Sequence, residues 1–259
     1  MDEKVLLSVR NVTKRFPLGR REFFTAVDDV SLDLLRGETL ALVGESGCGK
    51  STLAKMMMHI LTPDSGEILF EGERISGLAE RQMRPFRRRM QMVFQDPASS
   101  LDPRMKIRDI LAEPLRAWRV CRTEQELEDR ILELLDLVEL KESSLDRYPH
   151  RFSGGQKQRI GIARAIALKP DLLVCDECIS ALDVSVQAQI LNLLKKLKSD
   201  LGLTCLFISH DLSVVNFIAD RVAVMNRGRL CELADVERLF ADPQDEYTKY
   251  LLSAVYPLP

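Results

Sequence analysis

The sequence predicts an α/β fold, because short apolar runs alternate with segments of helical pattern. The runs Thr39–Val43, Leu172–Cys175 and Leu203–Ile208 are almost continuously apolar, which is typical of strands buried on both faces of a parallel sheet. Segments between these runs repeat their apolar residues at helical spacing. A chain of 259 residues can form one large domain with a small subdomain and a sizeable core.

The segment after the first run fits a phosphate-binding loop of the form Gly-x-x-x-x-Gly-Lys-Ser/Thr. It lies between the strand Thr39–Val43 and a helix predicted over Ser51–Leu61, which is the context that this motif requires. Its glycines let backbone N–H groups point inward, Lys50 reaches the outer phosphates, and the Ser51 hydroxyl suits Mg²⁺. A Gly/Ser-rich turn without a ligand is the disfavoured alternative. The predicted nucleotide-binding residues are Gly44, Glu45, Ser46, Gly47, Cys48, Gly49, Lys50, Ser51 and Thr52.

A second anion site is predicted at the start of another helix. Ser153 is a good helix N-cap, and apolar residues continue at helical spacing to Leu168, before Lys169-Pro170 stops the helix. Its first turn offers N–H groups to a phosphate from Ser153, Gly154, Gly155 and Gln156. One ATP does not need two such sites. The second therefore indicates a nucleotide held by a neighbouring subunit, and hence a dimer.

Three polar residues follow the ends of the predicted strands. Asp176 and Glu177 come after Leu172–Cys175, and His210 comes after the run that ends at Ile208. Ligands of open α/β sheets bind beyond the carboxyl ends of the strands. Because adjacent strand residues point to opposite sides, Asp176 is predicted to hold Mg²⁺ while Glu177 polarises water as the general base. A capping or buried polar role is the alternative for His210.

With the sequence Phe152-Ser153-Gly154-Gly155-Gln156 the chain resembles the nucleotide-binding subunits of ABC transporters. Phe152 replaces the usual leucine of their Leu-Ser-Gly-Gly-Gln signature. The resemblance covers nearly the whole chain and implies an ABC ATPase cassette, which is a P-loop NTPase core with an antiparallel β subdomain and a helical subdomain. The further motifs in family order are Phe16, Gln95, Asp176-Glu177, Ser180-Ala181-Leu182-Asp183 and His210.

The resemblance also implies roles for these residues. Phe16 is expected to stack on adenine, and the signature residues to bind ATP. Gln95 is expected to contact Mg²⁺ and the attacking water, and His210 the γ-phosphate. ATP and Mg²⁺ are the expected cofactors. The implied catalytic residues are Glu177, His210, Gln95 and Lys50, and the implied metal contacts are Ser51, Gln95 and Asp176.

Two segments resemble a narrower group, the importers of dipeptides, oligopeptides and nickel. They are residues 95–104 and the tail 247–254. This resemblance implies a peripheral subunit at the cytoplasmic face of the inner membrane. The implied partners are a second, different ATPase subunit, two membrane permeases and an extracytoplasmic binding protein. The short C-terminal end resembles nickel-type subunits and predicts no iron–sulfur site. Peptide and nickel chelate both remain open as the transported substrate.

The predicted organisation is one ABC ATPase domain over residues 1–259. Amphipathic helices are predicted over Ile107–Trp118 and Glu124–Leu140 from apolar spacings of three and four. The expected parts are an antiparallel β subdomain with the nucleotide loop (1–95), a helical subdomain (96–152), the signature helix with the catalytic core (153–220), and C-terminal strands and a helix (221–259).

Composition limits the other functions. The net charge of −2 gives no basic field for nucleic acid, and the arginine-rich stretch 81–90 is a solvated face or meets an anionic membrane surface. No apolar run approaches the roughly 20 residues that a spanning helix needs, so membrane contact is expected through partners. The six scattered cysteines suit a reducing cytoplasm. A redox or metal role for the Cys175-x-x-Cys178 pair is disfavoured.

Alternatives of other classes remain at this point. A soluble ABC ATPase acting in translation usually carries two cassettes, whereas DNA-repair relatives insert a long coiled coil between the halves of one cassette. This chain has a single nucleotide loop and a short middle segment. A regulatory module without turnover would lack Glu177 or His210. Two departures from the family, Cys178 and Phe152, remove no expected phosphate ligand, so an active ATPase is predicted.

Overall fold

A computed structural model describes residues 5–19, 22–96 and 99–253 of the chain. Of the importer-like segments, Pro97, Ala98 and Ala254 therefore lie outside the described residues. The chain forms two compact units, which are taken in turn below. Unit 1 comprises Met1–Arg84 and Thr204–Pro259, and unit 2 comprises Pro85–Leu203.

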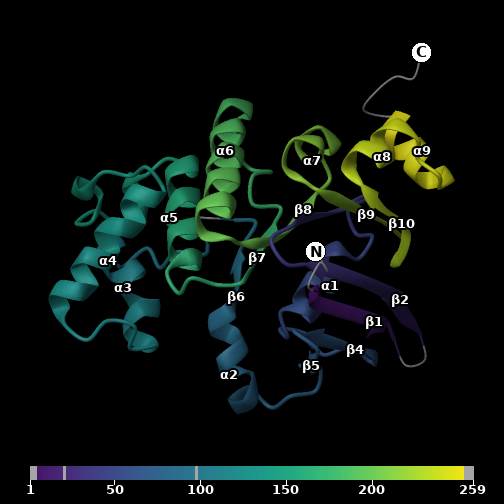
Figure 1. The fold of residues 1–259 in the computed structure, drawn as a ribbon, viewed down its shortest axis with the longest axis horizontal. Helices are drawn as coiled ribbons and strands as arrows, with labels where there is room; N and C mark the ends of the chain where they lie inside the picture. Colours follow the sequence, from purple (N-terminus) through teal and green to yellow (C-terminus); the bar gives the residue numbers. More distant parts are fainter. Residues whose placement is uncertain (1–4, 20–21, 97–98, 254–259) are drawn as a thin grey trace. The chain divides into compact units, whose positions relative to one another are not determined.

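Unit 1 contains an antiparallel sheet with the strand order β2-β1-β4-β5 (Figure 1). Its two long strands shift register at several points, so that the sheet bends. Buried apolar residues of these strands, among them Leu7, Val30 and Phe70, belong to the core. The strands are β1 (Val5–Pro17), β2 (Phe23–Leu35), β4 (Ser65–Phe70) and β5 (Glu73–Arg74).

The second sheet of unit 1 holds the phosphate-binding loop. Its central strand β3 (Thr39–Val43) is completely buried and pairs in parallel with β8 (Thr204–Ser209) and β9 (Arg221–Asn226). Strand β10 (Arg229–Asp235) pairs with β9 in antiparallel fashion. The helices of this unit are α1 (Lys50–Met57), α7 (Leu212–Ile218), α8 (Val236–Ala241) and α9 (Glu246–Ser253). Helix α2 (Glu80–Arg89) runs across the chain boundary between the units.

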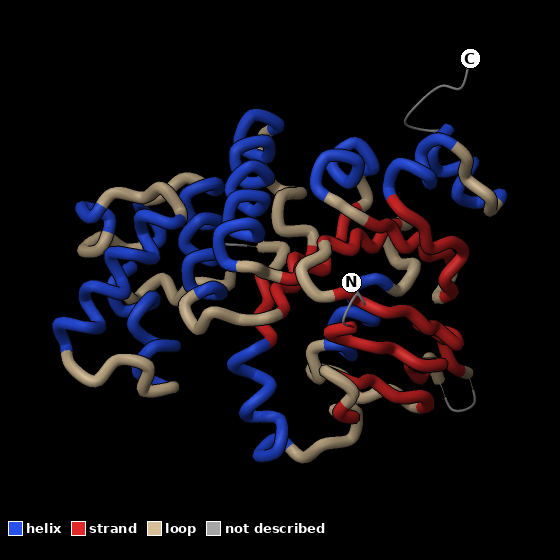
Figure 2. The backbone as a smooth tube through the Cα atoms, in the orientation of Figure 1, coloured by secondary structure: helices blue, strands red, loops and turns tan. Residues whose placement is uncertain are grey.

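Unit 2 is mainly helical (Figure 2). Its strands β6 (Met90–Val93) and β7 (Leu172–Asp176) pair in parallel. Helix α5 contacts α3, α4, α6 and β6, so it forms the centre of this unit. The helices are α3 (Ile107–Ala117), α4 (Glu124–Leu137), α5 (Gly154–Ile166) and α6 (Val184–Leu201), with the 3-10 turns η1 (Glu142–Ser144) and η2 (Pro149–Arg151).

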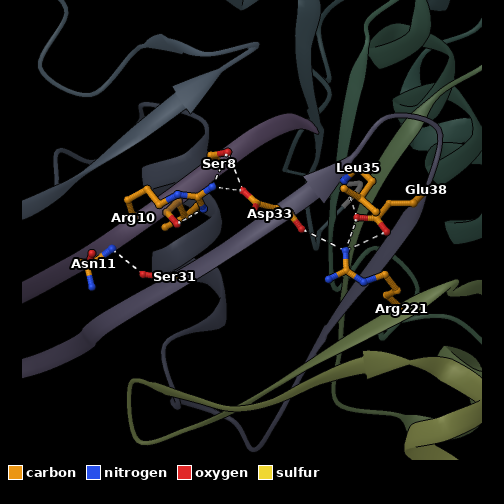
Figure 3. A network of polar contacts seen from close by, with 9 residues as sticks. Ser8, Arg10, Asn11, Ser31, Asp33, Leu35, Glu38 and Arg221 are labelled. Carbon is orange, nitrogen blue, oxygen red and sulfur yellow. Dashed lines mark hydrogen bonds and ion pairs between the residues drawn. The ribbon is translucent and has the colours of Figure 1, made fainter. Parts of the chain in front are cut away.

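A polar network joins β2, β3 and β9 within unit 1 (Figure 3). Glu38 directly precedes β3, is only 7% exposed, and accepts a hydrogen bond from the Leu35 N–H group at 2.6 Å. The Arg221 guanidinium lies 3.3 Å from both Glu38 carboxylate oxygens and also donates to the Asp33 carbonyl oxygen. The Asp33 carboxylate pairs in turn with Arg10 of β1. This network ties the turn before β3 to the neighbouring strands.

The predicted strands and helices are confirmed, with differences at their ends. Strand Thr39–Val43 has the predicted bounds. The helix predicted to reach Leu61 ends at Met57, because His59 takes a left-handed φ of 53° and the Ile60 N–H group returns to the Lys55 carbonyl. Among the described residues, no helix is both long and apolar enough to cross a bilayer.

Candidate functional site: a nucleotide-binding and hydrolysis site

The phosphate-binding loop of unit 1 is shaped by glycines between β3 and α1. Gly44, Gly47 and Gly49 all have positive φ angles, of 148°, 80° and 111°. A Cβ atom on Gly44 would lie 2.1 Å from the Met225 carbonyl oxygen, and one on Gly49 would lie 2.1 Å from the Ala26 carbonyl oxygen. Only glycine fits at these two positions. The loop is therefore fixed by backbone from β2 and β9.

Lys50 is buried within this loop and bonded to its backbone. It is 4% exposed, and its Nζ atom donates to the carbonyl oxygens of Gly44 at 2.8 Å and Glu45 at 2.9 Å. Nζ also lies 3.8 Å from the Cys48 Sγ atom. Burial raises the pKa of the Cys48 thiol, although the nearby Lys50 ammonium acts in the opposite direction. A buried cation thus lies inside the loop, as phosphate binding requires.

His210 lies at the same edge of the sheet as the loop. Val43, the last residue of β3, pairs with Ser209 of β8 in parallel register. Gly44 and His210 therefore follow paired positions at the carboxyl ends of adjacent strands, where ligands of α/β sheets bind. The structure thus brings His210 and the loop to one edge, and the His210 side chain is exposed.

Phe16 lies near the end of β1 in the antiparallel sheet, paired with Phe24 of β2. Its ring is partly exposed, and the Lys14 Nζ atom lies 5.8 Å from the ring centroid. The remaining loop residues follow β3 or begin α1; Glu45 and Ser46 are exposed, and Ser51 and Thr52 are partly exposed.

In unit 2 the structure brings Gln95 and Glu177 together. Val93 of β6 pairs with Cys175 of β7 in parallel, and each of the two polar residues follows two positions later. The Gln95 Nε2 atom donates a hydrogen bond of 2.8 Å to the Glu177 Oε2 atom. The amide and the carboxylate therefore form one polar cluster beyond the ends of these strands.

Glu177 departs from its predicted conformation. Strand β7 ends at Asp176, which is 8% exposed, and Glu177 takes a left-handed φ of 47°. The expectation that Asp176 and Glu177 alternate along a strand is therefore wrong. The Ser180 N–H group and hydroxyl both donate to the Glu177 carbonyl oxygen, at 3.1 and 3.0 Å, and hold this turn.

The signature helix α5 begins with a capping box. The Ser153 hydroxyl accepts a hydrogen bond from the Gln156 N–H group at 3.3 Å, and the Gln156 side chain accepts one from the Ser153 N–H group at 3.1 Å. Ser153, Gly154 and Gln156 are exposed. Gly155 is buried, and a Cβ atom there would lie 2.4 Å from the Val186 Cγ1 atom of α6. The first turn of α5 therefore leaves N–H groups that a phosphate can approach.

The two unusual residues and the cysteines have structural positions. Phe152 is 7% exposed and Cys178 is 1% exposed, so both side chains pack inside unit 2. All six cysteines are free thiols. No group of three or more His, Cys, Asp or Glu residues that could hold a metal ion occurs among residues 5–19, 22–96 and 99–253.

Sequence reasoning missed one contact at the loop. The N–H group of Glu45 donates a 3.2 Å hydrogen bond to the hydroxyl of Tyr247 on α9. No motif signals it, because the two residues are 202 positions apart.

Loop, signature helix and strand-end carboxylates together define an ATP-binding cassette, and the chain belongs to the ABC transporter family. The model of that family matches residues 27–180. The chain is 50% identical to the oligopeptide transport ATP-binding protein OppF of Bacillus subtilis (strain 168), over 100% of this chain and 84% of that protein. It is 47% identical to OppF of Streptococcus mutans, over 98% of this chain and 82% of that protein.

A solved structure of similar fold is the ATP-binding cassette MJ0796, a dimer in a post-hydrolysis state bound to ADP and Pi. The TM-score is 0.81 at 30% sequence identity, covering 89% of this chain and 99% of that chain. The predicted ABC ATPase fold is thereby confirmed.

Proposed function

We propose that this chain is the ATP-hydrolysing subunit that powers an oligopeptide importer. The observation that carries the proposal is the 50% identity to OppF along the entire chain. Both relatives named above are oligopeptide transport proteins. The comparisons therefore favour peptide as the transported substrate and give no specific support to nickel.

ATP binding rests on the loop of unit 1. Its backbone N–H groups and the helix α1 N-terminus suit the phosphates, and Lys50 is already held within the loop to meet the outer ones. Phe16 would stack on adenine, since its ring is partly exposed in the antiparallel sheet. At the start of α5, Ser153, Gly154, Gly155 and Gln156 would contact the γ-phosphate of ATP bound by a partner cassette.

Hydrolysis is assigned to Glu177 as general base. Its carboxylate takes a proton from water while the water oxygen attacks the γ-phosphorus and the bond to ADP breaks. The Gln95 amide, hydrogen-bonded to that carboxylate, orients it and the attacking water. His210 and Lys50 stabilise the negative charge that develops on the γ-phosphate oxygens.

Each residue expected to contact Mg²⁺ offers an oxygen donor. The Ser51 hydroxyl, the Gln95 amide oxygen and the Asp176 carboxylate are the hard ligands that this ion prefers. Asp176 suits the role because it is 8% exposed at the end of β7. When bound, the ion would neutralise phosphate charge.

The proposed partners follow from the family. A second ATPase subunit would complete the nucleotide site, two permeases would form the pathway at the cytoplasmic face of the membrane, and a binding protein would deliver peptide. Nucleic acid has no part in this proposal, since the net charge is −2.

Uptake by cells that lack the chromosomal copy of this gene tests the proposal. Cells supplied with the wild-type chain should accumulate a radiolabelled tripeptide, whereas Glu177→Gln should reduce uptake to the level of the deletion strain. Glu142→Gln is the control, because it makes the same change at an exposed residue of η1. Uptake of labelled nickel is measured in parallel.

Purification of the tagged chain from salt-washed membranes is a second test of the proposed function. Two permeases and another cassette should remain bound and be identified by mass spectrometry. Recovery of the chain with ribosomes or DNA instead would refute the proposed role in transport. Nickel uptake without peptide uptake would refute peptide as the transported substrate.

A further inference from the structure

The hydroxyl of Tyr247 contacts the phosphate-binding loop from the other end of the chain. Its Oη atom accepts a 3.2 Å hydrogen bond from the N–H group of Glu45, the second residue of the loop. Tyr247 belongs to α9, the last helix described, and both residues lie in unit 1. A C-terminal side chain thus holds the backbone of the nucleotide site.

The peptide group that Tyr247 contacts is the one that holds Lys50. The Glu45 N–H group and the Gly44 carbonyl belong to one planar peptide unit. Tyr247 accepts from its N–H side, and the Lys50 Nζ atom donates to its carbonyl side at 2.8 Å. Rotation of this peptide would break both hydrogen bonds. The hydroxyl therefore fixes an acceptor that helps to set the position of the Lys50 ammonium.

Tyr247 is itself held by β10. The Glu232 carboxylate on β10 accepts hydrogen bonds from the N–H groups of Gln244 and Asp245, at 3.0 and 3.1 Å. The Asp245 carboxylate then accepts from the Tyr247 N–H group at 2.9 Å. These contacts anchor the start of α9, so the position of the ring is determined by a strand rather than by a loose tail.

The Tyr247 ring packs against the core cluster that contains Ala41 and Val43 of β3 and Val224 of β9. Burial raises the pKa of its hydroxyl, so the group stays neutral at physiological pH and keeps both a proton and its acceptor capacity. A phenylalanine ring would preserve this packing and remove only the hydroxyl.

We propose that Tyr247 is a positioning residue for ATP binding, which acts by fixing the Gly44–Glu45 peptide and through it Lys50. The inference rests on the ATP-binding function proposed above. It also makes helix α9 part of the nucleotide site, so that displacement of α9 would weaken ATP binding without a change to any phosphate ligand.

The test compares Tyr247→Phe with Tyr250→Phe in the full chain. Both remove one hydroxyl from α9, and Tyr250 is 62% exposed. Titration with ATP and MgCl₂ should show a Kd raised roughly three- to tenfold for Tyr247→Phe, the effect of one lost hydrogen bond. Tyr250→Phe should bind like the wild type.

A second readout separates positioning from folding. Without nucleotide, both variants should melt within about 2 °C of the wild type, whereas the rise in Tm on addition of ATP should shrink only for Tyr247→Phe. In the assembled transporter, KM for ATP should rise with kcat changed less than about twofold. Equal Kd values for both variants would overturn the role of Tyr247, and failure of the wild type to bind ATP would overturn the proposed function instead.

Discussion

Glu177 takes a backbone conformation that a glutamate rarely adopts. A φ of 47° in a residue with a Cβ atom costs about 1–3 kcal/mol and persists only where the surroundings impose it. Here Ser180 holds the Glu177 carbonyl from one side and Gln95 holds the carboxylate from the other. The turn puts Glu177 beyond the end of the strand, where the role of general base proposed for it would be carried out.

Gly154 provides a test of the signature at the residue level. Its replacement by aspartate should reduce ATPase activity of the assembled transporter about 100-fold or more, because a carboxylate would repel the partner's γ-phosphate. Binding of ATP to the chain's own loop should stay within about twofold of the wild type. Steady-state phosphate release and ATP titration measure the two effects.

Gly154→Ala is the matched control for size. Its Cβ atom would lie 3.1 Å from the Leu182 Cδ2 atom, and the tip of that leucine can shift by the few tenths of an ångström required. The alanine variant should therefore keep most of its activity. Equal losses of ATPase activity in the two variants would mean that the size of the side chain at position 154, and not its charge, causes the loss.

Residues within short motifs were predictable from sequence, because local spacing fixes their environment. The glycine loop lies between a strand and a helix, and Ser153 caps its helix, both as expected. The left-handed turn at Glu177 was not predictable, because the apolar run Leu172–Cys175 does not show where the strand ends. Tyr247 was missed as well, because its partner is 202 positions away and the contact depends on tertiary packing.

At the level of elements, the Glu38–Arg221 pair fixes where β3 begins. The Glu38 carboxylate accepts hydrogen bonds from the Leu35 N–H group and from the Arg221 guanidinium of β9. Burial raises the pKa of the Glu38 carboxyl, although the Leu35 hydrogen bond and the Arg221 charge act in the opposite direction. A buried acid with a raised pKa favours the protonated form in the folded state.

This shift gives stability a predictable dependence on pH. Because the folded pKa lies above the unfolded one, the stability linked to Glu38 is complete below the ordinary pKa of glutamate and is lost as pH rises through the folded value. Glu38→Gln cannot titrate. The free energy of unfolding of the wild type minus that of Glu38→Gln should therefore fall as pH rises from about 4 to 7.

Urea unfolding of both proteins at several pH values measures this difference. A difference that stays constant, or that grows in favour of the wild type with pH, would contradict the assignment.

Elements with a short continuous apolar run were predicted well, because a run of this length between turn residues favours a strand buried on both faces. Helix ends were less predictable. The sequence predicts one final helix, but the structure has α8 and α9. The segment Asp242-Pro243 interrupts the helical pattern, and α9 restarts where Asp245 accepts from the Tyr247 and Thr248 N–H groups. Such a break depends on side-chain hydrogen bonds rather than on periodicity.

At the level of the whole molecule, the chain carries two helix N-termini suited to phosphate. One begins α1 in unit 1, and the other begins α5 in unit 2. We expect the second to bind ATP held by another cassette, so ATP should drive association. The Glu177→Gln variant with ATP and its partner cassette should therefore run as a stable dimer in size-exclusion chromatography with light scattering.

The same mixture with ADP in place of ATP is the control and should run as monomers, because ADP lacks the γ-phosphate that bridges the two chains. Monomers in both conditions would contradict a nucleotide-bridged dimer. Dimers in both would show association that does not depend on the γ-phosphate.

The close approach of Gly44 and Gly49 to distant backbone also bears on synthesis. Gly49 packs on Ala26, but Gly44 packs on Met225, and the Gly228 N–H group donates to the Cys48 carbonyl. The backbone around the loop thus comes from segments about 200 positions apart, Ala26 of β2 and Met225 of β9. A ribosome translates Gly44 long before Met225, so the nascent chain lacks one wall of its phosphate cradle until its last strands emerge. We therefore expect an unfinished chain to bind ATP more weakly than the folded cassette.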